Sequence, residues 1–269
     1  LPEKRQRVLL LVGSYAESKK SREYLDNLRP DWRGQVQHLV ADDDEFESQW
    51  QTSEAGLQRG MVHTFADTGA QILIAPLLAV ERGHNILNEI NQAAIGAVYF
   101  LVRPHPRPDD LGYAIQSINY WAIENYARTT ESSDSDTTVT AIAEIFRQSA
   151  FERWRYLLRL PLVYSTLPSD EHAAVTWSQL VTLWQVIGRL VRGGSPARVF
   201  FCDAAFAPHL YQEASSRTAS SLLVSIILLL DPYFDDDSVS IEERDRIVVQ
   251  TLYGPFYQAL KRMEGIANV

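Results

Sequence analysis

The chain of 269 residues contains a single cysteine, Cys202, two methionines and no long apolar run. A single cysteine cannot form an internal disulfide, so we expect a reducing compartment. The most apolar stretch, residues 222–230, is shorter than the roughly 20 residues that span a bilayer and predicts a buried helix. No segment has the pattern of a signal peptide. These absences predict a cytoplasmic protein with no membrane partner.

Phosphate-binding and metal-binding motifs are also missing. The sequence has no G-x-x-x-x-G-K-[ST] loop, no G-x-G-x-x-G fingerprint and no Asp-Glu pair after a clear apolar strand. His84 and His105 belong to no set with ligand spacing, so no metal site is predicted and a surface position is expected for both. The net charge of −9 excludes broad coating of nucleic acid but leaves room for a local basic track.

Five short, mostly apolar runs predict β-strands. They are residues 7–13, 35–41, 70–76, 96–104 and 197–203. Helical patterns lie between them: one helix is expected from Ser18, as its N-cap, to Pro30, and another over residues 45–68. Strands that alternate with helices predict an α/β fold, with a mostly parallel sheet flanked by helices.

Two regions depart from this alternation. Residues 111–175 show helical periodicity interrupted by the polar tract TTESSDSDTT, and predict a helical insertion that guides a strand or docks a partner. Its Trp and Tyr residues are expected to pack a helical core, with base stacking as the alternative. Residues 204–269 predict a helical C-terminal region, broken by the acidic loop DPYFDDDS. Residues 1–110 and 176–203 then form the α/β domain, and the initial LPEKRQR is interpreted as an interdomain linker.

The segment VTLWQVIGRLVR predicts a helix with two distinct rows of side chains. The apolar row is Leu180, Trp184, Ile187 and Val191. The second row, at i, i+3, i+4 and i+7 and turned by about 100° from the first, is Gln185, Gly188, Arg189 and Arg192. A glycine inside a helix costs about 1 kcal/mol, so its position beside two arginines calls for a reason. The alternative is a solvated helix face.

Three segments, in this order, resemble motifs IV, V and VI of the second RecA-like domain of superfamily 2 helicases and translocases. They are VLLLVGSYAESKKSREYL, ILIAPLLAVERGHNI and QVIGRLVR. The last fits the pattern Q-x-x-G-R-x-x-R and is the most specific. The resemblance implies a RecA-like fold and an ATP-dependent motor acting on nucleic acid, with DNA expected. ATP and Mg2+ would be held mainly by a first RecA-like domain, upstream or on another chain.

The resemblance also implies roles for individual residues. Arg192 corresponds to the arginine finger, with Arg189 and Gln185 as partners of the γ-phosphate and of the facing domain. The other implied ATP-site residues are Gly83, Asn85 and Gly188. The implied nucleic-acid contacts are Gly13, Ser14, Arg82 and Arg103. Pro76 stands where most relatives carry threonine, and residues 82–85 have an ordinary turn as their alternative interpretation.

The position of these residues in the sheet follows from its predicted topology. Parallel sheets bind ligands beyond the carboxyl ends of their strands, so we expect the loops after Gly13 and Pro76 at that edge. Without a phosphate-binding loop, the chain alone is expected neither to bind ATP tightly nor to hydrolyse it.

A narrower resemblance comes from RVFFCDAAFAP after TLWQVIGRLVRGG. This combination is similar to the helicase-like proteins of prokaryotic pPIWI-RE defence islands. It implies a bacterial cytosolic protein that acts beside an Argonaute-like partner and a nuclease. Two interpretations stay open: a degenerate RecA-like scaffold that binds partners without turning over ATP, and a Rossmann-like transferase, which no G-x-G-x-x-G supports.

Overall fold

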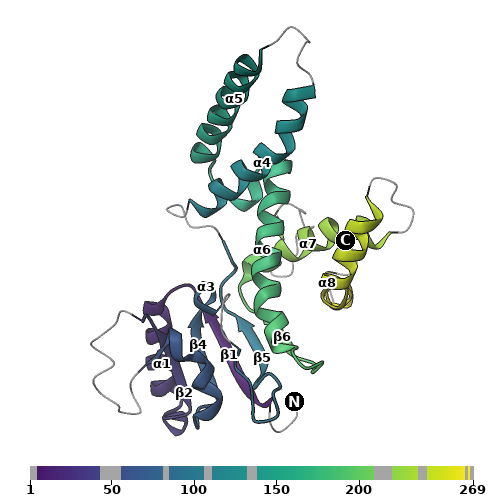
Figure 1. The fold of residues 1–269 in the computed structure, drawn as a ribbon. Coiled ribbons are helices and arrows are strands. Elements are labelled where there is room, and N and C mark those ends of the chain that lie inside the picture. Colours follow the sequence, from purple (N-terminus) through teal and green to yellow (C-terminus); the bar gives the residue numbers. More distant parts are fainter. Residues whose placement is uncertain are drawn as a thin grey trace. The chain divides into compact units, whose positions relative to one another are not determined.

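The computed structural model describes residues 5–42, 56–80, 85–105, 111–131, 138–208, 220–235, 241–263 and 266. The chain forms two compact units (Figure 1). Unit 1 comprises Leu1–Pro104 and Trp177–Val269, and unit 2 comprises His105–Thr176. Helix α6 (Ser169–Leu190) begins in unit 2 and ends in unit 1.

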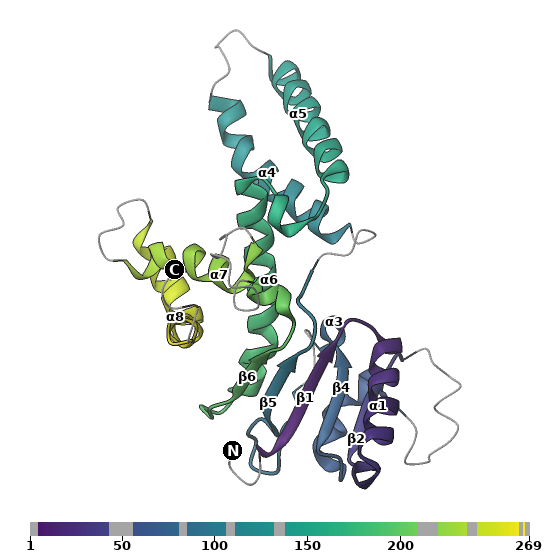
Figure 2. The ribbon, with the colours of Figure 1, turned by 180° about the vertical axis from the view of Figure 1, so that it is seen from behind.

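Unit 1 is built on a six-stranded parallel sheet, which confirms the predicted α/β class (Figure 2). The strands are β1 (Arg7–Val12), β2 (Val36–Val40), β3 (Leu57–Gln58), β4 (Ile72–Pro76), β5 (Ile95–Phe100) and β6 (Arg198–Phe201). Their order is β3-β2-β4-β1-β5-β6. All five predicted strands are present, and β4 and β6 belong to one sheet although more than a hundred residues separate them along the chain.

The helix expected over residues 45–68 is replaced, in its described part, by two other elements. Residues 43–55 lie outside the described residues. Strand β3 pairs in parallel with β2, and the 3-10 helix η3 (Arg59–Asp67) follows it. The prediction was wrong here because pairing with β2 is a tertiary contact that outweighs local helical periodicity.

Helix α1 (Tyr15–Leu28) covers one face of the sheet (Figure 2). Its N-cap is Ser14, whose Oγ accepts a hydrogen bond from the Glu17 amide at 3.1 Å, and not Ser18 as predicted. Ser18 is instead buried and donates to the Ile74 carbonyl at 2.7 Å. The 3-10 helix η2 (Pro30–Trp32) follows. The core on this face is Val12, Val36 and Ile74, with Leu10, Leu25, Trp32 and Ile72 packed against it.

The other face of the sheet carries η3, α3 (Leu77–Val80) and the C-terminal part of α6. Neighbouring residues of a strand point to opposite faces, so Leu9 faces these elements while Leu10 faces α1. A small, largely apolar cavity of about 40 Å³ remains among them, lined in part by Leu9, Val62 and Val186. This volume accommodates about one water molecule and is far too small for a nucleotide.

Two helices follow β6 and the 3-10 helix η5 (Ala204–Phe206): α7 (Leu222–Phe234) and α8 (Glu243–Lys261). Helix α7 continues through the DPYF segment, so the first part of the predicted acidic loop is helical; residues 236–240 lie outside the described residues. Two tryptophans of α6 pack against aromatic side chains of α8: Trp177 contacts Tyr253, and Trp184 contacts Tyr253 and Phe256.

Unit 2 consists of α4 (Gly112–Glu131), α5 (Val139–Arg159), the 3-10 helix η4 (Tyr164–Thr166) and the first residues of α6. Helices α4 and α5 pack through aromatic side chains, with Trp121 stacked on Phe146 at 5.6 Å between ring centroids. No strand occurs among the described residues of this unit.

Candidate functional site

The C-terminal half of α6 is held by apolar side chains on more than one side. Its buried residues are Leu180, Leu183, Val186, Ile187 and Leu190. Trp184 and Val191, which were expected on the apolar row, are only half-buried. Trp184 packs against Phe256 of α8, and Val191 lies beyond the end of the helix. Packing against both the sheet and α8 widens the apolar surface beyond a single stripe.

The two arginines of the QVIGRLVR segment contact residues of the ILIAPLLAVERGHNI segment. Arg189 donates from Nη1 to the Val80 carbonyl, and Arg192 donates from Nη1 to Asn85 Oδ1. The residues of the second pair are 107 positions apart in the chain. Arg192 lies just past the end of α6 and not on its last turn, and is exposed. The fold therefore brings Arg189, Arg192 and Asn85 together.

Two glycines shape the chain beyond Arg192. Gly193 and Gly194 have φ of 76° and 71°, the left-handed region that favours glycine, and reverse the chain before β6. Gly188 plays a different part, because a Cβ placed there would meet nothing within 4 Å. Packing within the described residues does not require this glycine, so it leaves an open patch beside Arg189.

Gln185, the first residue of the polar row, is half-buried. Its Oε1 is buried and has no hydrogen-bond partner among the described residues. Burying a polar atom without a partner costs about 1–3 kcal/mol, so the Gln185 amide, close to the arginine pair, has an unsatisfied hydrogen-bond acceptor.

Arg5 fixes the end of α6 to the sheet. It is only 1% exposed, and its guanidinium donates to the carbonyls of Ala93 at 2.9 Å, Pro196 at 2.7 Å, Ile95 at 3.3 Å and Leu190. Burial lowers the pKa of this guanidinium. The initial segment was expected to be an interdomain linker, but from Arg5 onward it belongs to the fold.

The contacts of Arg192 and of Leu190 place the end of this segment near the amino ends of the central strands. Arg5, two residues before β1, contacts both Leu190 and the first residue of β5. The carbonyl of Ile86, next to Asn85, accepts a hydrogen bond at 2.9 Å from Ala94, which directly precedes β5. We expected the loop containing Asn85 at the carboxyl edge; its described end has instead returned along the sheet to the amino edge.

Gly13 and Ser14 lie at the opposite, carboxyl end of β1 and support the start of α1. The Gly13 amide donates to Glu17 Oε2 at 2.7 Å, while Ser14 caps the helix. A six-residue strand is about 20 Å long, so these residues are far from Arg192. A phosphate at this position would have to displace the Glu17 carboxylate.

Arg103 also follows the carboxyl end of a strand, β5. Its amide donates to Asp203 Oδ2 at 3.1 Å, and its Nη1 donates to the Ala205 carbonyl at 3.4 Å. Both contacts join the ends of β5 and β6. Arg82 and Gly83, the remaining predicted site residues, lie outside the described residues. The predicted site residues thus form two groups at opposite ends of the sheet.

The second half of α6 and the segment up to β6 carry only basic charge, although the chain as a whole is acidic. Residues 172–202 contain three arginines and no acidic residue or lysine, in a chain whose net charge is −9. Asn85 offers Arg192 a neutral oxygen and does not compensate its charge. Two guanidinium groups beside an open glycine patch suit an oxyanion such as a phosphate.

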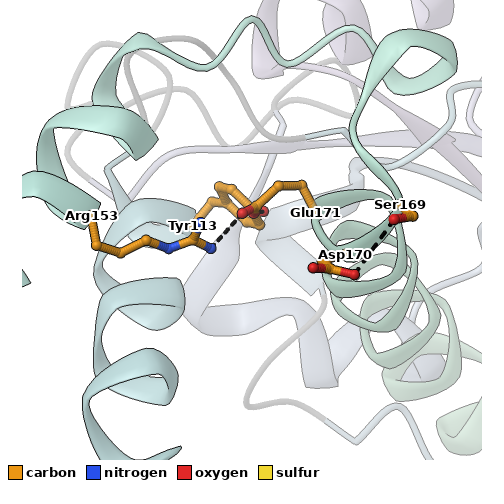
Figure 3. A network of polar contacts seen from close by, with 5 residues as sticks. All are labelled: Tyr113, Arg153, Ser169, Asp170 and Glu171. Atoms are coloured by element: carbon orange, nitrogen blue, oxygen red, sulfur yellow. Dashed lines mark hydrogen bonds and ion pairs between the residues drawn. The ribbon is translucent and has the colours of Figure 1, made fainter. Parts of the chain in front are cut away.

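A buried polar cluster in unit 2 is centred on Glu171 (Figure 3). Glu171, 3% exposed, accepts a hydrogen bond from the Tyr113 hydroxyl at 2.5 Å and forms an ion pair with Arg153. Burial and the bond to Glu171 raise the pKa of Tyr113. The cluster joins α4, α5 and the start of α6 through the hydrogen bond and the ion pair of Glu171. No sequence motif pointed to it.

No family model, curated protein or solved structure matches the chain. The class that the molecule itself defines is an α/β protein with a parallel sheet and added helices. None of the described helices is long and apolar enough to cross a membrane, and no cluster of three or more His, Cys, Asp or Glu that could hold a metal ion occurs among the described residues.

Proposed function

We propose that this chain is the second RecA-like motor domain of an ATP-dependent nucleic-acid helicase or translocase. The parallel sheet supports the proposal at the level of fold class. The observation that carries it is the contact between Arg192 and Asn85, which joins the segments that resemble motifs V and VI. ATP with Mg2+ would be bound mainly by a first RecA-like domain, and this chain would contribute Arg192, Arg189 and Gln185.

The arrangement supports an arginine finger on physical grounds. A guanidinium can donate to several phosphate oxygens at once and offset the charge that develops during phosphoryl transfer. Arg192 is exposed, and its described partner is a neutral amide that a phosphate oxygen can replace. The open patch at Gly188 leaves space for a facing domain to approach.

The test is the ATPase activity of a protein that contains this chain together with its first RecA-like domain. Arg192→Ala should lower nucleic-acid-stimulated turnover about 10³- to 10⁵-fold and leave the fold and most ATP binding intact. Arg192→Lys should restore little, because lysine keeps the charge without the planar fork. Wild-type turnover in Arg192→Ala would remove the assignment and leave Arg189 to be tested.

A scaffold without ATP turnover is the second candidate. The observation that favours it is that Arg189 and Arg192 already hydrogen-bond within the chain, where they tie α6 to the segment before β5. This candidate predicts that Arg192→Ala changes the stability of the domain or its binding to a partner, with no nucleotide turnover to lose in either protein.

The narrower resemblance extends the proposal to the cellular setting. On this basis we propose that the protein acts on DNA in the bacterial cytoplasm, beside an Argonaute-like protein and a nuclease. Of the residues assigned to nucleic acid, Gly13, Ser14 and Arg103 have the structural contacts described above, so their contribution to DNA binding would come in addition to those contacts.

A further inference from the structure

The C-terminal half of α5 concentrates positive charge in an acidic chain. Residues 147–159 contain four arginines and one glutamate, for a net charge of +3, whereas the whole chain has a net charge of −9. Residues 131–146, which precede them, contain four acidic residues and no arginine or lysine. The arginines are therefore gathered at one end of the helix and are not spread over it.

Three of these arginines lie with a phenyl ring along one side of α5. Positions four residues apart are turned by only about 40°, so they form a continuous row about 18 Å long. We call it the arginine row: Arg147, Phe151, Arg155 and Arg159. All four side chains are exposed, Arg147 to 74% and Phe151 to 59%. The buried and half-buried apolar residues lie on the other side of the helix: Ile142, Phe146, Ala150 and Leu157.

The guanidinium groups of the arginine row are open to a ligand. Arg147 pairs with Glu144 at 3.0 Å, but both side chains are exposed, and an ion pair in water is weak. Within the described part of the chain, neither Arg155 nor Arg159 forms an ion pair. The fourth arginine, Arg153, is outside the row, because it is half-buried and pairs with Glu171.

Phe151 distinguishes the arginine row from an ordinary solvated helix face, which is polar. Its exposed ring lies between two arginines of the row, and the guanidinium of Arg155 is 5.7 Å from the ring centroid. Leu158, 51% exposed, lies on the same side of α5. Arginines that contact phosphates, next to a ring on which a base can stack, are the combination by which proteins hold single-stranded nucleic acid.

We infer that the arginine row binds a single strand of nucleic acid, with its arginines on phosphates and Phe151 against a base. Of the two roles expected for the insertion, guiding a strand therefore fits α5. The inference deepens the proposed function and rests on it for the kind of partner. A duplex suits the row less well, because its bases are already stacked on one another and leave Phe151 without a base to contact.

The test is fluorescence anisotropy of the full chain with a labelled oligothymidylate of about 20 nucleotides, longer than the row, over a range of salt concentrations. Phe151→Leu keeps an apolar side chain but removes the ring, and should weaken binding at least about fivefold with the salt dependence unchanged. Arg155→Gln should lower the slope of log Kd against log salt concentration by about 0.7, as expected for one lost phosphate contact. Both positions are exposed, so both variants should fold, which circular dichroism checks.

Matched controls carry the same substitutions elsewhere. Tyr120 of α4 is an aromatic residue that is 68% exposed, and residues 111–126 around it contain no arginine or lysine. Arg244 of α8 is exposed and lies between Glu243 and Asp245. Tyr120→Leu and Arg244→Gln should therefore bind the oligonucleotide as the wild-type chain does.

Several results would overturn the inference: no binding by the wild-type chain, unchanged affinity in Phe151→Leu, equal losses in the controls, or equal affinity for a duplex of the same length. Phosphatidylserine vesicles present anionic groups without bases and should not displace the oligonucleotide; displacement would point to a membrane surface and also overturn it. The measurement contains no ATP. Oligonucleotide binding through this row by a protein without ATPase activity would keep the inference and reject the motor, and an active ATPase with unaffected variants would do the reverse.

Discussion

At the scale of single residues, Arg5 is the side chain on which the end of α6 most depends. One guanidinium serves four carbonyl groups from three segments: Ala93 and Ile95 at the start of β5, Leu190 at the end of α6, and Pro196 before β6. A buried cation is tolerated only where its donors are satisfied, and Arg5 meets this condition through these four backbone carbonyls. Arg5 therefore fixes the position of Leu190, two residues before Arg192.

Arg5→Met should lower the free energy of unfolding of unit 1 by about 3 to 5 kcal/mol, because the carbonyls in this buried region lose their donors. Arg5→Lys should recover only part of the loss, since one ammonium group cannot reach all four acceptors. Urea unfolding measures both. Arg7 serves as the comparison: it donates to two carbonyls, those of Ala66 and Thr68, so Arg7→Met should cost clearly less. Equal losses for Arg5→Met and Arg7→Met would contradict the assigned role.

At the scale of elements, α7 and α8 are joined by a polar cluster at the edge of their aromatic contact. The Tyr257 hydroxyl of α8 donates to Asp231 Oδ1 of α7 at 2.6 Å, and Lys261 contacts the same carboxylate oxygen at 3.3 Å. Tyr257 also stacks on Phe234 at 4.1 Å between ring centroids. Burial, followed by the bond to Asp231, raises the pKa of Tyr257 to about 12.

This shift predicts a loss of stability at alkaline pH. A tyrosine with a raised folded-state pKa stabilises the fold fully below its unfolded-state pKa of about 10, and that contribution is lost as the pH rises from about 10 to about 12. Tyr257→Phe should unfold more easily at neutral pH, by about 1 kcal/mol, and should lose less stability over the alkaline range. Urea unfolding at a series of pH values tests this; an unchanged alkaline slope would reject it.

Elements with a clear local sequence pattern were predictable, whereas an element that depends on pairing with a distant strand was not. The five apolar runs identified β1, β2, β4, β5 and β6. The central strands β4, β1 and β5 are almost entirely apolar because both faces of the sheet are covered there, whereas β6 lies at the edge and is only partly buried. Strand β3 has only two residues and exists through its pairing with β2. The N-cap of α1 is also indicated by the local sequence, because Ser14 and Glu17 form the S-x-x-E pattern of a capping box.

At the scale of the whole molecule, the sequence was a better guide to which segments contact each other than to where in the fold that contact lies. The motif resemblance associated Asn85 with Arg192, and the structure places them in contact. Their position near the amino ends of β1 and β5 depends on contacts with residues distant in the chain, such as the hydrogen bond from Ala94 to Ile86, and no local pattern indicates it. The burial of Arg5 was unpredictable for the same reason, since its acceptors are backbone carbonyls of distant segments.

The division into two units predicts that unit 2 can open while the sheet stays closed, because the contacts of its buried cluster all lie within His105–Thr176. Glu171→Gln removes the charge opposite Arg153 and should destabilise unit 2 by about 3 kcal/mol. Hydrogen exchange followed by mass spectrometry should then show faster exchange in α4 and α5 and unchanged exchange in β1, β4 and β5. Asp170→Asn is the matched control, because this neighbouring carboxylate has only a 3.5 Å contact with Ser169 (Figure 3). Exchange that rises equally in the strands would show that the chain opens as one body.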